Sequence, residues 1–251
     1  MDRTLRRTGA GLVLALIAGC AGPKTETPVV TTSGEGKTTS PAGTEAAKRG
    51  KSLIRFVNAV PDARGLDLSA DERTTFYNVE FKAVTPYTEI GDNLVKFELR
   101  GTDMDSVLAN NTESMGDGLR YTLVAMPTSD SQITLRVVRD EVVTEVGKAR
   151  IRVINAAPVL PDADVLVSGQ KDPLFDNIAY GTEAGFKDVT PATATLEIRG
   201  NDNPTPPIRL RNVALAAGKA YTIVITSAKP RGIQTITFND AVRPTIAART
   251  P

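Results

Sequence analysis

The sequence contains no histidine, no tryptophan and a single cysteine, Cys20, among its 251 residues. Histidine is the usual general base at neutral pH, a common metal ligand and a member of Ser/His and Cys/His catalytic groups, so its absence argues against those chemistries. A single cysteine excludes a disulfide within the chain and a thiolate zinc site. We therefore expect a protein that is not an enzyme and that uses no cofactor and no metal.

The charged residues nearly balance, with 30 basic against 29 acidic side chains and a formal net charge of +1. A nearly neutral chain gives no electrostatic reason to expect binding to nucleic acid. The hydrophobic fraction of 41% is typical of folded globular proteins. The composition therefore predicts folded domains without a nucleic-acid partner.

The amino terminus has the layout of a secretion signal. A basic segment precedes an apolar run from Ala10 to Ala18 that is too short to span a bilayer. The small residue Gly19 then stands directly before Cys20, the only cysteine of the chain. This pattern resembles the bacterial lipoprotein signal, and the resemblance implies that residues 1–19 are removed by cleavage between Gly19 and Cys20.

The same resemblance implies that Cys20 becomes the first residue, carries a thioether-linked diacylglycerol on its sulfur and is usually N-acylated as well, with palmitate among the fatty acids. Two or three acyl chains, at about 0.8 kcal/mol per buried methylene, hold a protein stably on a membrane. We therefore expect a location in the cell envelope, in the outer membrane if the organism has two membranes. The alternative is an ordinary cleaved signal followed by an accidental cysteine.

Residues 20–50 are rich in Thr, Pro, Gly, Ser, Lys and Glu and contain few large apolar side chains. Such a segment gains too little from burial to offset the entropy of ordering, which predicts a flexible tether. As a coil it would span on the order of 30 Å. At the other end of the chain, we expect residues 243–251 to form a loose tail.

The segment Ile54–Pro61 (IRFVNAVP) recurs 97 positions later as Ile151–Pro158 (IRVINAAP). The offset between the two halves grows only from 97 to 100 along the chain, as small loop insertions would produce. The sequence therefore predicts two copies of one domain, at residues 51–146 and 147–242. The further matched blocks are Phe76–Phe81 with Phe175–Tyr180, Phe97–Gly101 with Leu196–Gly200, and Gly118–Val124 with Gly218–Val224.

The matched blocks have the period of β-strands. Apolar residues alternate with polar or charged ones in Val95–Arg100 and in Ala194–Arg199, as in strands with one buried face. About seven such strands are expected in each copy, and no stretch of ten residues has helical spacing. This pattern predicts an all-β protein of two tandem antiparallel β-sandwich domains with an immunoglobulin-like architecture.

The connection between the copies, residues 139–148, has neither a proline nor a long flexible run. We therefore expect a semi-rigid pair of domains, with Val142, Val143 and Val146 covering the junction. The charges at Arg150 and Arg152 alternate with apolar residues and predict a solvated strand face.

Three segments resemble a known family: Ile54–Leu68 (IRFVNAVPDARGLDL), Tyr77–Tyr87 and Leu215–Val224 (LAAGKAYTIV). They are similar to domain of unknown function 4397, which occurs in secreted and lipid-anchored prokaryotic proteins, often in tandem. The resemblance covers residues 50–240 and thus both copies. It rests on strand-and-turn patterns, and it implies no activity.

Asn58 and Asn155 occupy the same place in the two copies, directly before the chain turns toward a proline. We expect their side chains to bond neighbouring backbone groups at this corner, although a ligand contact is the alternative. Tyr121 and Tyr221 are a second repeated pair, each on the apolar face of its strand.

Asp67 and Asp164 also recur, each among apolar neighbours. They are interpreted either as polar residues of an outer face or as halves of a catalytic carboxylate pair. The oxygen-rich segments Asp162–Asp164 and Asn201–Asn203 could bind calcium, but turn capping by Asp and Asn is the favoured interpretation.

Together these patterns predict a lipid-anchored protein that binds or scaffolds an envelope protein or polysaccharide. A hydrolase that acts on envelope polymer through carboxylates is one alternative, and a passive stalk or spacer is another.

Overall fold

The computed structural model describes residues 50–61, 63–91, 93–140, 144–200, 207–228 and 232–240. The predicted signal peptide, Cys20, the tether up to residue 49, Asn201–Asn203 and the tail all lie outside these residues. Every regular element within the described ranges is a β-strand. The part of the chain that is described contains no helix of the length and apolar character that crossing a membrane requires.

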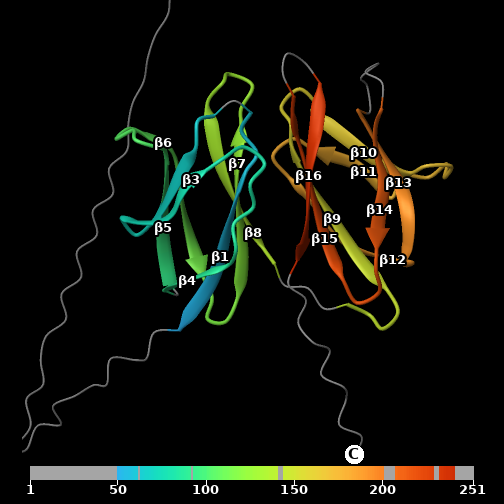
Figure 1. Cartoon of the computed structure of the whole chain (residues 1–251), viewed down its shortest axis with the longest axis horizontal. Helices are drawn as coiled ribbons and strands as arrows, with labels where there is room; N and C mark the ends of the chain where they lie inside the picture. The colour runs from blue at the N-terminus through green and yellow to red at the C-terminus, as the bar shows by residue number, and fades with distance from the viewer. Residues whose placement is uncertain are drawn as a thin grey trace, which may run out of the picture. The chain divides into compact units, whose positions relative to one another are not determined.

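The described part of the first half of the chain contains eight strands, which form two sheets (Figure 1). The strands are β1 (Lys51–Asn58), β2 (Leu66–Ala70), β3 (Arg73–Val79), β4 (Thr88–Gly91), β5 (Asn93–Gly101), β6 (Val107–Met115), β7 (Arg120–Pro127) and β8 (Ile133–Arg139). One sheet has the order β4-β1-β7-β8 and the other β3-β2-β5-β6. We call this pair of sheets sandwich 1.

The second half repeats the arrangement as sandwich 2, with sheet orders β12-β9-β15-β16 and β11-β10-β13-β14. Its strands are β9 (Ala149–Ala156), β10 (Asp162–Val167), β11 (Phe175–Ala179), β12 (Glu183–Val189), β13 (Ala192–Gly200), β14 (Ile208–Leu215), β15 (Ala220–Ser227) and β16 (Ile233–Asp240). The all-β class and the two tandem sandwiches predicted from the repeat are confirmed.

Two details differ from the prediction. Each sandwich has eight strands where about seven were expected. Each also contains one parallel pair, since β1 runs parallel to β7 and β9 runs parallel to β15, whereas all other neighbouring strands are antiparallel. Alternation at period two predicts which face of a strand is buried, but it carries no information about the direction of the neighbouring strand.

Each sandwich has its own apolar core between its two sheets. On β5 the side chains of Val95, Phe97 and Leu99 are buried while that of Lys96 is exposed, as the alternation predicted. Phe56 lies in the same core and stacks near Phe76 at 6.3 Å between ring centroids. Burial of each such large side chain stabilises the fold by about 1.5–3 kcal/mol. In sandwich 2, Ile151, Phe175 and Leu196 belong to the corresponding core.

A third apolar cluster joins the two sandwiches. It contains Val57 and Val124 from β1 and β7, and Ile154 and Val224 from β9 and β15. The central strands β1 and β9 are therefore covered on both faces, which explains why their sequences are apolar almost without interruption. The predicted role of Val146 at the junction is wrong, because this side chain is 93% exposed. Val142 and Val143 lie outside the described residues.

Candidate functional site

The two repeated asparagines form a buried corner in each sandwich. Asn58 Nδ2 donates to the carbonyl of Val79 (2.9 Å), and its Oδ1 accepts from the amide of Val60 (2.9 Å). Asn155 Nδ2 donates to the carbonyls of Leu160 and Ile178, and its Oδ1 accepts from the amide of Ala157. Both side chains are completely buried, so neither is available to a ligand.

The repeated aspartates hold a distorted strand pair in each copy. Asp67 Oδ1 accepts from the amide of Asn78 (2.8 Å), and Asp164 Oδ1 accepts from the amide of Asn177 (2.9 Å). Both asparagines have a positive φ, and the strand register shifts beside each aspartate, as at a β-bulge. Asp67 also accepts from Thr102 Oγ1 (2.6 Å). The carboxylates therefore satisfy the backbone of an irregular strand.

The repeated tyrosines fasten the turn that precedes β7 and β15. The hydroxyl of Tyr121 accepts from the amide of Gly116 (2.9 Å), and that of Tyr221 accepts from the amide of Ala216 (3.0 Å). A tyrosine at the start of a strand that bonds the backbone a few residues upstream is the tyrosine corner of immunoglobulin-like sandwiches. The sequence pattern placed these residues on the apolar face but did not reveal the bond.

Replacing Tyr121 with Phe is expected to lower the free energy of unfolding by about 0.5–1.5 kcal/mol, because the amide of Gly116 loses its acceptor. Urea denaturation measures the change. The matched control is Tyr77→Phe, because the hydroxyl of Tyr77 donates to Asp103 (3.2 Å) on the exposed surface and its loss should change stability by no more than about 0.5 kcal/mol. Equal losses in the two variants would contradict the role of Tyr121 at the turn.

The segment Asp162–Asp164 offers little to a calcium ion, because one carboxylate oxygen of Asp164 is already engaged with backbone. Its other oxygen lies 3.9 Å from Arg199 Nε. Among the residues that the structure describes, no three His, Cys, Asp or Glu side chains gather as a metal site requires.

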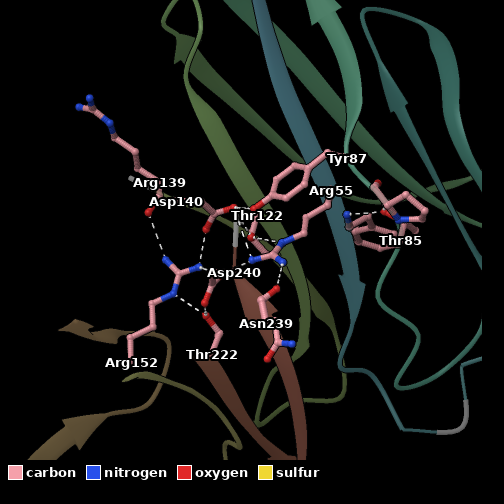
Figure 2. A network of polar contacts seen from close by, with 12 residues as sticks. Arg55, Thr85, Tyr87, Thr122, Arg139, Asp140, Arg152, Thr222, Asn239 and Asp240 are labelled. Carbon is pink, nitrogen blue, oxygen red and sulfur yellow. Dashed lines mark hydrogen bonds and ion pairs between the residues drawn. The ribbon is translucent and has the colours of Figure 1, made fainter. Parts of the chain in front are cut away.

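The most organised polar cluster of the described chain lies between the two sandwiches, where the sequence predicted a solvated face. Arg55 on β1 and Arg152 on β9 are both almost fully buried, so the solvated face predicted for Arg152 is wrong. Figure 2 shows their guanidinium groups directed at two buried carboxylates, Asp140 after β8 and Asp240 at the end of β16. We call these four residues the charge quartet.

Each arginine of the charge quartet donates hydrogen bonds to residues at the end of the last strand of the other sandwich. Arg55 Nη2 donates to Asp240, and Arg55 Nη1 donates to the carbonyl of Asn239 (3.0 Å). Arg152 Nη2 donates to Asp140 and also lies 3.2 Å from Asp240 Oδ1, and Arg152 Nη1 donates to the carbonyl of Arg139 (3.1 Å). Charges this deeply buried persist only when they are paired and hydrogen-bonded.

Two threonines complete the charge quartet in the same way on both sides. Arg55 Nε donates to Thr122 Oγ1 (2.7 Å), which in turn donates to Asp140 Oδ2 (2.5 Å). Arg152 Nε donates to Thr222 Oγ1 (2.7 Å), which in turn donates to Asp240 Oδ2 (2.6 Å). Every carboxylate oxygen of the charge quartet therefore accepts at least one hydrogen bond.

Aromatic rings cover the guanidinium groups. Arg55 lies 4.8 Å from the ring of Tyr87 and 4.3 Å from that of Phe238, and Arg152 lies 4.7 Å from the ring of Phe186. Tyr87 also donates its hydroxyl to Asp140 Oδ2 (2.8 Å). Such cation–π contacts are most favourable where the cation is shielded from water, as here.

The electrostatics follow from this burial. Burial and the charge of Asp140 raise the pKa of the Tyr87 hydroxyl well above its usual value. Burial lowers the pKa of the Arg152 guanidinium, but Asp140 and Asp240 outweigh it, and the net pKa is raised. Burial raises the pKa of Glu183, whose Oε2 lies 3.5 Å from Arg152 Nη1. The carboxylate oxygens of Asp140 and Asp240 are all engaged by arginine, threonine or tyrosine donors, so the charge quartet can bind the two sandwiches together but offers no free carboxylate.

A signal for the charge quartet is present in the sequence. Arg55 and Arg152 stand at the same place in the two copies. Each lies in a mostly apolar run in which the next position on its own face of the strand, two residues further along, is apolar. Thr122 recurs as Thr222 inside the matched blocks YTLV and YTIV. Buried arginines need buried acids, and the acids that recur at the ends of the last strands are Asp140 and Asp240.

The fold and the charge quartet define an all-β protein built from two copies of one sandwich that are joined by buried side chains. The family model described as Domain of unknown function (DUF4397) matches residues 52–162 and again residues 149–250. The chain belongs to this family.

No curated protein matches the sequence at a significant level. A crystal structure of a candidate cell adhesion protein from Bacteroides fragilis is similar at a TM-score of 0.21 and 11% identity, covering 88% of this chain and 96% of that one. A TM-score this low says nothing about a site.

Proposed function

We propose that the protein is a lipid-anchored protein of the cell envelope with a non-catalytic binding or scaffolding role. The observation that carries the non-catalytic part is the engagement of its repeated and buried carboxylates. Asp67 and Asp164 accept hydrogen bonds from the backbone at a bulge. The carboxylates of Asp140 and Asp240 accept hydrogen bonds from arginine and threonine side chains. A polymer hydrolase would need a free pair of carboxyl groups across a cleft.

The anchoring part is supported by the sequence alone. The lipoprotein-like signal ends at the only cysteine of the chain, and the segment that follows has the composition of a tether. Anchored through Cys20, the two sandwiches would face an envelope protein or polysaccharide outside the membrane. The family match adds no activity to this proposal.

A passive spacer is the second candidate, and the interface between the sandwiches favours it. The buried apolar cluster and the charge quartet join the two halves by side chains as well as by the chain itself. An interface of this kind holds the two sandwiches in a fixed arrangement. A spacer requires such rigidity, and a protein that presents a binding surface benefits from it as well.

Anchoring is tested by labelling cells with radioactive palmitate. We expect the wild-type protein to take up label and to sediment with membranes, and the Cys20→Ser variant to take up none. Label on the variant, or a wild-type protein that is unlabelled and washes free of membranes, would overturn the anchoring.

The binding role is tested separately by photo-crosslinking in intact cells, with the crosslinker placed at single exposed positions of each sandwich. A binding protein gives products that depend on the position of the crosslinker. A spacer gives none, or the same background from every position.

A further inference from the structure

The two sandwiches differ in chemistry at one equivalent end. In sandwich 1 a cleft of about 680 Å³ is lined by charged side chains of both signs, among them Lys51, Asp71, Arg73 and Glu89. In sandwich 2 a cleft of about 480 Å³ occupies the corresponding place, and we call it the apolar cleft. The correspondence follows from the repeat, because Ala70, Ile90 and Val95 of the first cleft align with Val167, Val189 and Ala194 of the second.

The walls of the apolar cleft come from a longer loop. Residues 71–72 alone connect β2 to β3, whereas residues 168–174 connect β10 to β11. This loop places Pro173 and Leu174 against the cleft. It is held by Lys187 Nζ, which donates to the carbonyl of Leu174 (2.8 Å), and by the amide of Gln170, which donates to the carbonyl of Val167 (2.9 Å).

The floor of the apolar cleft is part of the core of sandwich 2. Leu215 is buried, and Val167, Leu174 and Ala194 are partly buried and packed on that core. The polar lining consists of Gln170, Asp172 and Thr190. A concave, mostly apolar site with a few polar groups is typical of binding sites for small molecules, and its volume lies in their range.

The charges that line the apolar cleft favour an uncharged ligand over an anionic one. Among the described residues that line the apolar cleft there is no lysine or arginine, and Asp172 is the one with a charged side chain. The nearby ammonium group of Lys187 is directed at a carbonyl oxygen. A carboxylate or phosphate in the cleft would lie beside the carboxylate of Asp172, and no lysine or arginine among the described lining residues offsets that repulsion. An uncharged head group can instead exchange hydrogen bonds with Gln170, Asp172 and Thr190.

We propose that the apolar cleft binds an uncharged amphiphile, with an aliphatic chain on the floor formed by Val167, Leu174, Ala194 and Leu215 and a hydroxyl- or amide-bearing head at the polar lining. This gives a ligand class to the binding role proposed above and rests on that role, but not on the lipid at Cys20.

The test uses the chain from residue 20 to 251 with Cys20→Ser, which removes its own acyl chains as competitors. Both sandwiches lie within a single compact unit, so this chain keeps both of them. Methyl NMR signals of valine, leucine and isoleucine are followed during titration with n-octyl-β-D-glucoside below its critical micelle concentration. We expect saturable shifts of Val167, Leu174, Val189 and Leu215, and unchanged shifts of Ile90 and Val95 at the equivalent cleft. Octanoate should cause no saturable shift.

Two variants of neighbouring residues separate the cleft from the rest of the surface. Ala192 is exposed and lines the apolar cleft, while Thr193 is exposed and does not. Ala192→Trp should weaken binding of the glucoside by about tenfold or more, and Thr193→Trp should change it by less than about twofold. Asp172→Lys should allow octanoate to bind.

Three results would overturn the apolar cleft as the site: absence of saturable shifts in the wild-type chain, equal effects of the two tryptophan variants, or octanoate binding as well as the glucoside. The labelling and crosslinking results do not depend on this titration, so the failure of one is distinguishable from the failure of the other.

Discussion

Replacement of Arg152 by methionine is expected to lower the free energy of unfolding by about 3–5 kcal/mol. Methionine fills much of the same volume but leaves Asp140 without its closest ion-pair partner and removes a cation 3.2 Å from Asp240. Asp140 then keeps Arg55 at 3.6 Å as its remaining guanidinium, and a buried carboxylate that loses its closest cation is left partly uncompensated. Urea denaturation of the purified protein, followed by circular dichroism at neutral pH, measures the loss.

Arg150→Met is the matched control, because Arg150 lies two residues away on β9 and pairs with Asp188 at the partly exposed edge of the sheet. Ion pairs in contact with water contribute little, so we expect a change of about 1 kcal/mol or less. Equal losses of stability in the two variants would contradict a special role of the charge quartet in holding the sandwiches together.

Replacement of Asn155 by leucine is expected to lower the free energy of unfolding by about 3 kcal/mol or more. The substitution removes one acceptor and two donated bonds, and it leaves the carbonyls of Leu160 and Ile178 and the amide of Ala157 without that partner inside sandwich 2. Each unsatisfied buried group costs about 1–3 kcal/mol. Chemical denaturation again provides the measurement, and binding by any other surface of the protein should persist.

Asn110→Leu provides the comparison for this second change, because Asn110 lies on β6 with an exposed side chain. A surface substitution of this kind should alter stability by no more than about 0.5 kcal/mol. A stable Asn155→Leu protein that had lost a binding activity would reverse the assignment and make the asparagine a ligand contact.

The fold was largely predictable because its two strongest signals are independent of long-range contacts. The recurrence of Ile54–Pro61 at Ile151–Pro158 revealed the two copies, and the alternation along Val95–Arg100 revealed strands with one buried face. The parallel pairing of β1 with β7 left no such trace, because it depends on which distant strand lies alongside.

Prediction failed where a strand is covered on both faces. Arg152 alternates with apolar residues, and on a strand with one wet face it would be solvated. In this protein the second face of β9 packs in the apolar cluster shared by the two sandwiches, so both faces of the strand are buried. Arg152 on that second face therefore needs a buried acidic partner, which is Asp140. Val146 illustrates the opposite error, since an apolar side chain in the connecting segment remains exposed.

Repetition marked architecture more clearly than it marked a site. Asn155, Asp164 and Tyr221 have counterparts in the first copy, and all three bond the backbone of their own sandwich. The apolar cleft escaped notice for the complementary reason, because it lies where the copies diverge. Leu174 in the wall of the cleft aligns with Thr75 of the first copy. Comparing the two halves of the sequence highlights positions that are the same in both, so it does not point to a position where they differ.

The reciprocity of the charge quartet has a consequence for how many copies such a chain can combine. Arg55 reaches Asp240 while Arg152 reaches Asp140, so the two sandwiches use the same patch toward each other, as the subunits of an isologous homodimer do. An isologous contact is saturated by two members. A third sandwich added to this chain would find neither patch vacant, and longer arrays could grow only as a series of closed pairs joined through some other surface.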